Sequence, residues 1–297
     1  SYVCYLQVNF MEQLKLFIEL TRLKKPIGYM LLFWPCTWGL TIAYDFNNEI
    51  TNYIFFLFLF FLGAILMRSA GCIMNDIVDR NFDIKVRRTR FRPIASGKIS
   101  VTQGAVYAIF LCLFAFIILL EFNKLTILLA LSSMPLAFTY PYMKRFTYWP
   151  QLFLGITFNY GLILGWTSIK SDIDSIIFLF YLGAIFWTLG YDTIYGFQDI
   201  KDDEIIGLKS TSIKFKNYPV KFVSLSYIVF LTSLLISGIY LELNSFFYLV
   251  FILIIIQVVF FQLMKININN SDQCLNIFKS NNFLGLMVLL SLLIGKL

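Results

Sequence analysis

Residues 53–83 read YIFFLFLFFLGAILMRSAGCIMNDIVDRNFD and contain both the main structural signal and the main chemical signal of the chain. The first part, Tyr53–Met74, is apolar apart from one charged residue, Arg68, and one small polar residue, Ser69. Because about 20 mostly apolar residues are needed for a helix to cross a bilayer, this part predicts a membrane-spanning helix. The sequence then changes abruptly to Asn, Asp and Arg, which places polar groups at one end of the span.

The whole chain has a membrane-protein composition. Of its 297 residues, 59% are hydrophobic and only 14% are charged, and the mean hydropathy is +0.76. A soluble domain carries roughly 25% charged residues. The sequence therefore predicts an all-α, polytopic membrane bundle of about nine transmembrane helices, forming a single domain over residues 1–297. The predicted spans are Ile27–Tyr44, Tyr53–Met74, Gly104–Leu120, Leu125–Met143, Trp149–Ile169, Ile173–Tyr191, Phe222–Leu241, Phe246–Met264 and Phe283–Ile294.

The basic residues indicate the orientation in the membrane. When the loops between predicted spans are assigned to alternating sides, most of the 24 Lys and Arg residues fall on one side. The positive-inside rule identifies that side as the cytoplasm, or as the matrix in a mitochondrial membrane. The net charge of +7 is thus explained by topology and not by nucleic-acid binding. Residues 1–25 precede the first span, and Met11–Leu23 within them has the pattern of an amphipathic helix lying on the membrane surface.

We expect a bacterial inner membrane, because no Arg- and Ser-rich transit segment precedes the predicted helices. The mitochondrial inner membrane is the alternative location.

Several chemistries are excluded by composition. The chain has no His, so His-ligated metals, Ser-His-Asp triads and imidazole acid–base catalysis are ruled out. The five Cys include no C-x-x-C pair and are expected to be small apolar residues in helices.

Two short stretches hold seven of the 17 acidic residues. They are residues 75–83, at the inner end of the second predicted span, and residues 192–203, at the inner end of the sixth. Asn75, Asp79 and Asp83 are spaced to lie on one face of a helix, and the same spacing argument places Asp192, Tyr195, Asp199 and Asp203 on one helical face. Four spans separate the stretches, which suggests one site built between two halves of the chain.

The acidic stripes predict a metal–diphosphate site. Carboxylates on one stripe repel each other unless cations lie between them. Oxygen ligands of this kind suit Mg²⁺, which typically binds one or two carboxylates together with substrate phosphates. Basic residues flank both stretches, as phosphate oxygens require. The alternative is a solvated acidic helix end, and the basic residues could equally be ordinary cytoplasmic anchors.

Arg68 lies inside a predicted span, where arginines are costly and usually face a cavity. Its spacing from Cys72, Asn75 and Asp79 places it on the helix face of the proposed ligands. A guanidinium beside a metal site can bind an anion, and a carboxylate suits its bidentate geometry. The alternative is a structural ion pair with another helix.

Four parts of the sequence resemble motifs of the UbiA superfamily of membrane prenyltransferases. Asn75-Asp-x-x-Asp79-x-x-x-Asp83, with residues 68–72 before it and 90–97 after it, resembles the first motif. Asp192-x-x-Tyr195-x-x-x-Asp199-x-x-x-Asp203, followed by residues 205–211, resembles the second, with Gly196 where the family has Ala. Residues 25–28 with 34–35, and residues 140–145, are similar to the 4-hydroxybenzoate polyprenyltransferase branch.

The resemblance implies that a polyprenyl group is transferred from its diphosphate to the ring of 4-hydroxybenzoate, with Mg²⁺ as cofactor, in ubiquinone biosynthesis. It implies metal ligation by Asn75, Asp76, Asp79, Asp83, Asp199 and Asp203, catalytic roles for Arg68, Asp192 and Tyr195, and contacts to the diphosphate or the acceptor by Lys85, Arg88, Arg92, Tyr140, Lys144, Arg145 and Lys209. Asp192 or a phosphate oxygen would accept the ring proton. Arg68 or Arg145 would hold the acceptor's carboxylate. The hydrophobic tail would lie between helices, open to the lipid bilayer.

Other acceptors stay open within the superfamily: dihydroxynaphthoate, homogentisate, haem and chlorophyllide. The stretch with Arg68 and the Asp192-x-x-Tyr195 pattern favour 4-hydroxybenzoate by resemblance. Soluble isoprenyl diphosphate synthases also have paired Asp-rich motifs, but the composition excludes them. A cation transporter is the alternative of a different class. It should carry ionisable groups in several spans, whereas here the spans are nearly bare of charge except for Arg68.

Overall fold

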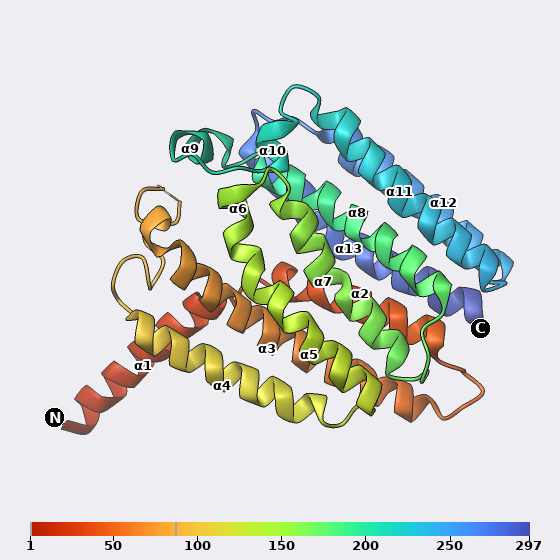
Figure 1. The fold of residues 1–297 in the computed structure, drawn as a ribbon, viewed down its shortest axis with the longest axis horizontal. Coiled ribbons are helices and arrows are strands. Elements are labelled where there is room, and N and C mark those ends of the chain that lie inside the picture. The colour runs from red at the N-terminus through yellow and green to blue at the C-terminus, as the bar shows by residue number, and fades with distance from the viewer. Residues whose placement is uncertain (1, 87) are drawn as a thin grey trace. The chain divides into compact units, whose positions relative to one another are not determined.

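The structure is a computed structural model that describes the backbone of residues 2–86 and 88–297 and the side chains of residues 11–86 and 88–297. The described residues form helices and no strands (Figure 1). The elements are α1 (Tyr2–Thr21), α2 (Ile27–Ala43), α3 (Ile50–Asp83), α4 (Val101–Leu119), α5 (Lys124–Thr139), η1 (Tyr140–Tyr142), α6 (Met143–Phe146), α7 (Pro150–Thr167), α8 (Ser175–Gly196), α9 (Ile200–Ile205), α10 (Thr211–Lys214), α11 (Pro219–Tyr240), α12 (Ser245–Ile256), η2 (Gln257–Gln262), η3 (Leu263–Lys265) and α13 (Ser271–Lys296).

Each predicted span coincides with a helix or with a continuous series of helical segments. Among the described residues, 7 helices are long and apolar enough to cross a membrane, and the apolar α2 is shorter. The remaining predicted span corresponds to α7, which has 18 residues. Two spans are composite, because α5 continues through η1 into α6 and α12 continues through η2 into η3. The chain is thus an all-helical, multi-span membrane protein, as predicted.

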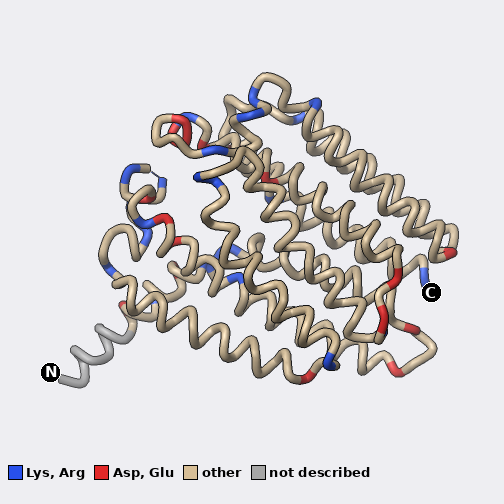
Figure 2. Tube along the Cα trace, viewed as in Figure 1, with Lys and Arg blue, Asp and Glu red and all other residues tan. Residues whose placement is uncertain are grey.

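The helices divide into two compact units, which are described separately. Unit 1 comprises residues 1–29 and 62–121, and unit 2 comprises residues 30–61 and 122–297. The single domain expected over residues 1–297 stays a prediction. Charged residues in both units lie mostly in loops and at helix ends, while the middles of the helices are nearly free of them (Figure 2). This is the distribution that a bilayer imposes, since charge in the hydrocarbon layer is costly.

Unit 1 has its own hydrophobic core. Leu20 at the end of α1 is fully buried and packs in one cluster with Ile73 of α3, Ala108 of α4, and Ile94 and Ile99 from the loop between those helices. The end of α1 and residues 84–100 are therefore held against α3 and α4 by buried apolar side chains.

Unit 2 is organised around α8, which packs against α7, α11 and α13. Its buried Trp187 lies against Trp38 of α2 and Phe230 of α11, with ring centroids 5.0 and 6.0 Å apart. Small residues allow close helix contact elsewhere. A Cβ on Gly39 of α2 would lie 1.9 Å from the carbonyl oxygen of Leu162 in α7. Helices in lipid associate through this kind of close packing, because burial from lipid supplies little driving force by itself.

Candidate active site

The first acidic stretch lies on an unbroken helix. α3 continues from Ile50 to Asp83, so Asn75, Asp79 and Asp83 share one face, as predicted from their spacing. Asp79 and Asp83 are 1% and 6% exposed, and Asp76 between them is 2% exposed. Buried carboxylates need compensating positive charge or hydrogen bonds, and two arginines of unit 1 supply charge to part of this group.

Arg22 and Arg92 neutralise two of the carboxylates that were predicted to bind metal. One nitrogen of Arg22 donates a hydrogen bond to Asp76 Oδ1 over 2.6 Å, and Arg92 Nη1 donates to the same oxygen over 3.1 Å. Arg92 Nη1 also donates to Asp83 Oδ2 over 2.8 Å. These bonds tie the segment after α1 and the loop before α4 to the acidic face of α3. Arg92, predicted to contact substrate, thus lies beside the predicted ligands.

Arg22 lies within the Met11–Leu23 segment, whose pattern predicts an interfacial helix and no role in the site. The residue follows α1 directly and has a φ of 56°, a conformation that non-glycine residues seldom adopt. Burial lowers the pKa of its guanidinium, but interactions with Cys72 and Asp76 raise the pKa more, to above its ordinary value. Nothing in the local sequence distinguishes this arginine from the neighbouring lysines.

Arg68 of α3 is half-buried and lies against the start of α2. A Cβ built on Gly28 would be 2.8 Å from Arg68 Nε, so the guanidinium occupies the space that a side chain at position 28 would need. The prediction that Arg68 shares a helix face with Asn75 and Asp79 is confirmed by the continuity of α3. Gly28 belongs to the Lys25–Gly28 stretch that resembles the family, and its contact with Arg68 gives a structural reason for a glycine there.

The loop between α3 and α4 carries the other predicted basic contacts of unit 1. Lys85 and Arg88 are exposed, and Arg92 is half-buried.

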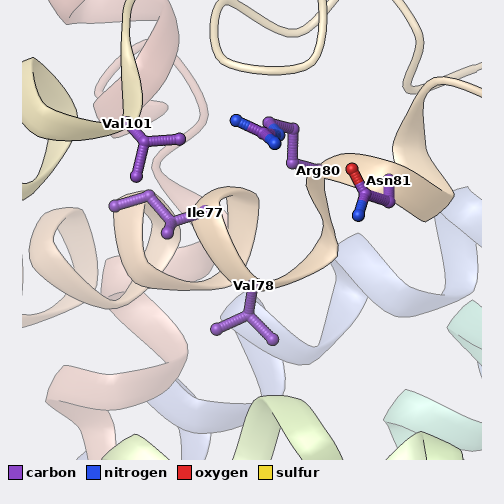
Figure 3. Close-up of a pocket in the computed structure, with 5 residues that line it drawn as sticks. All are labelled: Ile77, Val78, Arg80, Asn81 and Val101. Atoms are coloured by element: carbon purple, nitrogen blue, oxygen red, sulfur yellow. The ribbon is translucent and has the colours of Figure 1, made fainter.

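A cavity of about 210 Å³ lies in unit 1, lined by Ile77, Val78, Arg80, Asn81 and Val101 (Figure 3). None of the predicted ligands lines it, so it is not the predicted site.

The second acidic stretch is not one continuous helix, and here the prediction of a single helical face was wrong. α8 ends at Gly196, residues 197–199 form a turn, and Asp203 lies on the short helix α9. Only Asp192 and Tyr195 therefore share the helix α8. The described contacts give the reason: Ser212 donates a hydrogen bond to the carbonyl of Thr193 over 2.7 Å, and a Cβ on Gly196 would lie 2.3 Å from Ser212 Oγ.

Unit 2 brings two of its predicted substrate-binding segments together. The backbone N–H of Lys209 donates to the carbonyl of Lys144 over 2.9 Å, and Lys209 Nζ donates to the carbonyl of Phe146 over 3.4 Å. Tyr140 begins η1 and Arg145 lies in α6, so the Tyr140–Arg145 segment adjoins the residues that follow the second acidic stretch. Lys144, Arg145 and Lys209 are all half-buried.

Tyr195 and its neighbours contact the last helix, which the sequence identified only as a hydrophobic run. The ring of Tyr195 lies 4.5 Å from that of Phe278 in α13, measured between centroids. Tyr191, one turn earlier on α8, lies 5.8 Å from the same ring. Asp192, Tyr195, Asp199 and Asp203 are all half-buried.

The donor set of the two stretches suits a magnesium ion chemically, since all the side chains offer oxygen. Among the described residues, no group of three or more Cys, Asp or Glu side chains forms a ready-made metal site. Mg²⁺ commonly needs only one or two carboxylates when substrate phosphates complete its shell, so the residues fit a metal that arrives with a diphosphate. The stretches belong to different units, and a site shared by both stays a prediction.

Comparison with known proteins agrees with these observations. The UbiA prenyltransferase family model matches residues 32–287. The chain is 41% identical to the mitochondrial 4-hydroxybenzoate polyprenyltransferase of Bos taurus, over 95% of this chain and 75% of that protein. It is 38% identical to the 4-hydroxybenzoate octaprenyltransferase of Nitrosomonas eutropha, over 98% of this chain and 100% of that protein.

The fold also matches solved structures. A UbiA homologue from Archaeoglobus fulgidus bound to GPP and Mg²⁺ superposes with a TM-score of 0.72 at 17% identity, covering 94% of this chain and 98% of that one. The apo structure of a UbiA homologue from Aeropyrum pernix gives a TM-score of 0.71 at 20% identity, covering 91% and 99%. With the acidic stretches, the intramembrane arginine and the helical architecture in agreement, the chain belongs to the UbiA prenyltransferase family.

Proposed function

We propose that this protein transfers a polyprenyl chain from polyprenyl diphosphate to the ring of 4-hydroxybenzoate, a step of ubiquinone biosynthesis. The names of the relatives from Bos taurus and Nitrosomonas eutropha support this acceptor. The observation that carries the proposal is Arg68, a half-buried intramembrane arginine held against Gly28 on the helix face of Asn75 and Asp79. It offers a carboxylate-binding group beside a diphosphate site, and 4-hydroxybenzoate carries a carboxylate.

Asn75, Asp79, Asp199 and Asp203 are proposed to hold Mg²⁺. Bound there, the metal would supply positive charge to the diphosphate. The structure of the Archaeoglobus fulgidus homologue bound to GPP and Mg²⁺ supports this ligand chemistry for the fold. Asp76 and Asp83, also predicted as ligands, are paired with Arg22 and Arg92. Their proposed role is therefore to anchor those arginines beside the site.

The basic residues are proposed to neutralise the leaving group. When the allylic C–O bond breaks, its electron pair goes to the diphosphate, and the added charge is taken up by nearby cations. The proposed cations are Lys85, Arg88, Arg92, Lys144 and Lys209. Tyr140 is proposed to donate a hydrogen bond to the same group.

The acceptor ring then forms the new bond. The ring carbon ortho to the phenol oxygen attacks the allylic cation, a C–C bond forms, and that carbon loses its proton. Asp192 is proposed as the proton acceptor, and Tyr195 as an aromatic face toward the cation. Arg68 holds the carboxylate at the other end of the acceptor, with Arg145 as the second candidate for that role.

The site is proposed to face the cytoplasm of a bacterium or the matrix of a mitochondrion. Most Lys and Arg residues fall on the side of the membrane that bears both acidic stretches. An inner membrane is the proposed location, in keeping with relatives from both mitochondria and bacteria.

The test uses purified protein in detergent with geranyl diphosphate, 4-hydroxybenzoate, and either Mg²⁺ or EDTA, followed by mass spectrometry. A prenylated hydroxybenzoate that forms with Mg²⁺ and is lost with EDTA is the expected result. Parallel reactions contain dihydroxynaphthoate or homogentisate as the acceptor. Product with one of these and none with 4-hydroxybenzoate would overturn the proposed acceptor but keep the reaction class.

A further inference from the structure

A buried hydrogen-bond network connects four segments of unit 2. Trp187 of α8, Gln262 of η2 and Asn281 of α13 are 0% exposed, and Tyr227 of α11 is 1% exposed. Tyr227 Oη donates to Gln262 Oε1 over 2.6 Å, and Trp187 Nε1 donates to Asn281 Oδ1 over 2.8 Å. The two amides donate to each other's oxygens over 3.1 and 3.3 Å. Each amide oxygen thus accepts two hydrogen bonds, and buried networks satisfied in this way are rigid.

A π-helical segment creates one side of this network. Residues Gln257–Gln262 form η2, in which hydrogen bonds run from residue i to i+5. This winding places Gln257 and Gln262 above one another, and Gln262 Nε2 donates to Gln257 Oε1 over 3.0 Å. In a regular α-helix, residues five apart point in different directions. The π-turn is therefore what directs both glutamines toward α13, and such turns are frequent at functional sites.

The network leads to the second acidic stretch along two routes. On α8, Trp187 packs edge-on against Tyr191, with ring centroids 5.0 Å apart. On α13, Phe278 lies one turn before Asn281, and its ring contacts both Tyr191 and Tyr195. The hydrogen bond between Trp187 and Asn281 holds these two helices in register, and this register sets the position of Phe278 against Tyr195.

Close packing keeps the network in place. A Cβ on Gly190 of α8 would lie 2.7 Å from the ring of Tyr227, so this ring packs closely against the backbone of α8. Tyr227 consequently has little freedom to move away from Gln262. The inner end of α8 is thus bounded by α11 on one side and by α13 on another.

We infer that Asn281 and Gln262 are positioning residues that act through Tyr195, by holding α8 and the Phe278 ring in a fixed register. The inference rests on the proposed function, because Tyr195 has its role in that reaction. Neither residue would touch the substrate. Replacing them would let water capture a larger share of the allylic cation, because Tyr195 would no longer be held beside it.

The experiment is a double-mutant cycle. Asn281→Leu and Phe278→Leu are each made in the wild-type chain and in Tyr195→Leu, which removes the aromatic face, and kcat is measured with geranyl diphosphate and 4-hydroxybenzoate. The second measurement is the ratio of geraniol, formed by water capture, to prenylated product. Phe278→Leu removes the ring contact and leaves every hydrogen bond of the network in place, so it covers the case in which Asn281→Leu fails to fold.

We expect each single variant to lower kcat about tenfold and to raise the geraniol ratio, and to change kcat by no more than about twofold in the Tyr195→Leu background, where the ring to be positioned is absent. The matched control is Ser291→Ala, a fully buried α13 residue whose hydroxyl donates to the carbonyl of Val288 in its own helix, which should change neither quantity. Equal effects in both backgrounds, or an unchanged geraniol ratio, would overturn the inference and leave a purely structural role. A wild-type chain without product would instead contradict the proposed function.

Discussion

The guanidinium of Arg68 lies over the backbone of Gly28, so close that a Cβ at position 28 would be 2.8 Å from Arg68 Nε and 3.5 Å from Arg68 Cζ. The two residues are 40 positions apart in the sequence. The contact accounts both for the glycine at position 28 and for the placement of the Arg68 side chain. A glycine at the start of α2 makes space for a charged side chain inside a span. The helix backbone in turn limits the directions in which that side chain can point.

Gly28→Ala should misplace Arg68 without unfolding the protein. The added methyl group displaces the end of a flexible side chain, and Ala is favoured over Gly in helices by about 1 kcal/mol. We expect the KM for 4-hydroxybenzoate to rise about tenfold, since small displacements of a substrate-holding group are costly. Steady-state kinetics at saturating geranyl diphosphate measures this. Gly71→Ala is the matched control, because nothing lies within 4 Å of a Cβ there; an equal rise in KM in both variants would contradict the explanation.

Arg68→Ala should abolish the preference for a charged acceptor. Truncating a buried charge partner typically costs about 2–5 kcal/mol, so kcat/KM for 4-hydroxybenzoate should fall at least about 30-fold. The kcat/KM for the neutral analogue 4-hydroxybenzamide should fall much less. Competition between the two acceptors, read by mass spectrometry, measures the change in preference. Arg80→Ala serves as control, as Arg80 is exposed on the same helix. An unchanged preference would rule out carboxylate binding by Arg68.

Asp79→Asn and Asp199→Asn should each lower kcat by at least about 100-fold, the loss expected when charge stabilisation of a leaving group is removed. The protein should still extract from membranes as a folded, monodisperse species. A Mg²⁺ titration of the residual activity should require more metal than the wild type does. Glu204→Gln tests a neighbouring acid that pairs with Lys216 on the surface. If Asp79→Asn kept the wild-type magnesium requirement, Asp79 would not be a ligand.

Asp76→Asn and Arg22→Gln should lower the thermal stability of the protein and leave the magnesium requirement of its activity unchanged. A hydrogen bond between charged, buried partners contributes about 1.5–3 kcal/mol, and Asp76 takes part in two such bonds. Thermal unfolding in detergent should show a lower Tm for both variants, with an unchanged magnesium requirement. Lys216→Gln breaks an exposed ion pair and should change Tm little, since such pairs contribute about 0–1 kcal/mol. A raised magnesium requirement in Asp76→Asn would contradict this prediction and identify Asp76 as a metal ligand.

Local patterns predicted the first acidic stretch well and the second only in part. Asn75, Asp79 and Asp83 follow a long apolar run with no residue that interrupts a helix, so their spacing translated directly into one helical face. In the second stretch the same spacing was misleading. The helix ends at Gly196, where Ser212 approaches from the short helix α10. Helical spacing describes a face only while the helix continues, and its end depended here on a tertiary contact.

The sequence by itself determined the membrane class, the helical spans, the two acidic stretches and the family, because these depend on composition and on short-range order along the chain. Tertiary structure alone decided that Arg22 pairs with Asp76, that Gly28 receives Arg68, and that Gln262 meets Asn281 through a π-turn. In each case a common residue type, with nothing unusual around it, acquires its role from a partner on another segment. A hydrogen bond or a close contact needs two groups within a few ångströms, and it is the packing of the helices that brings them there.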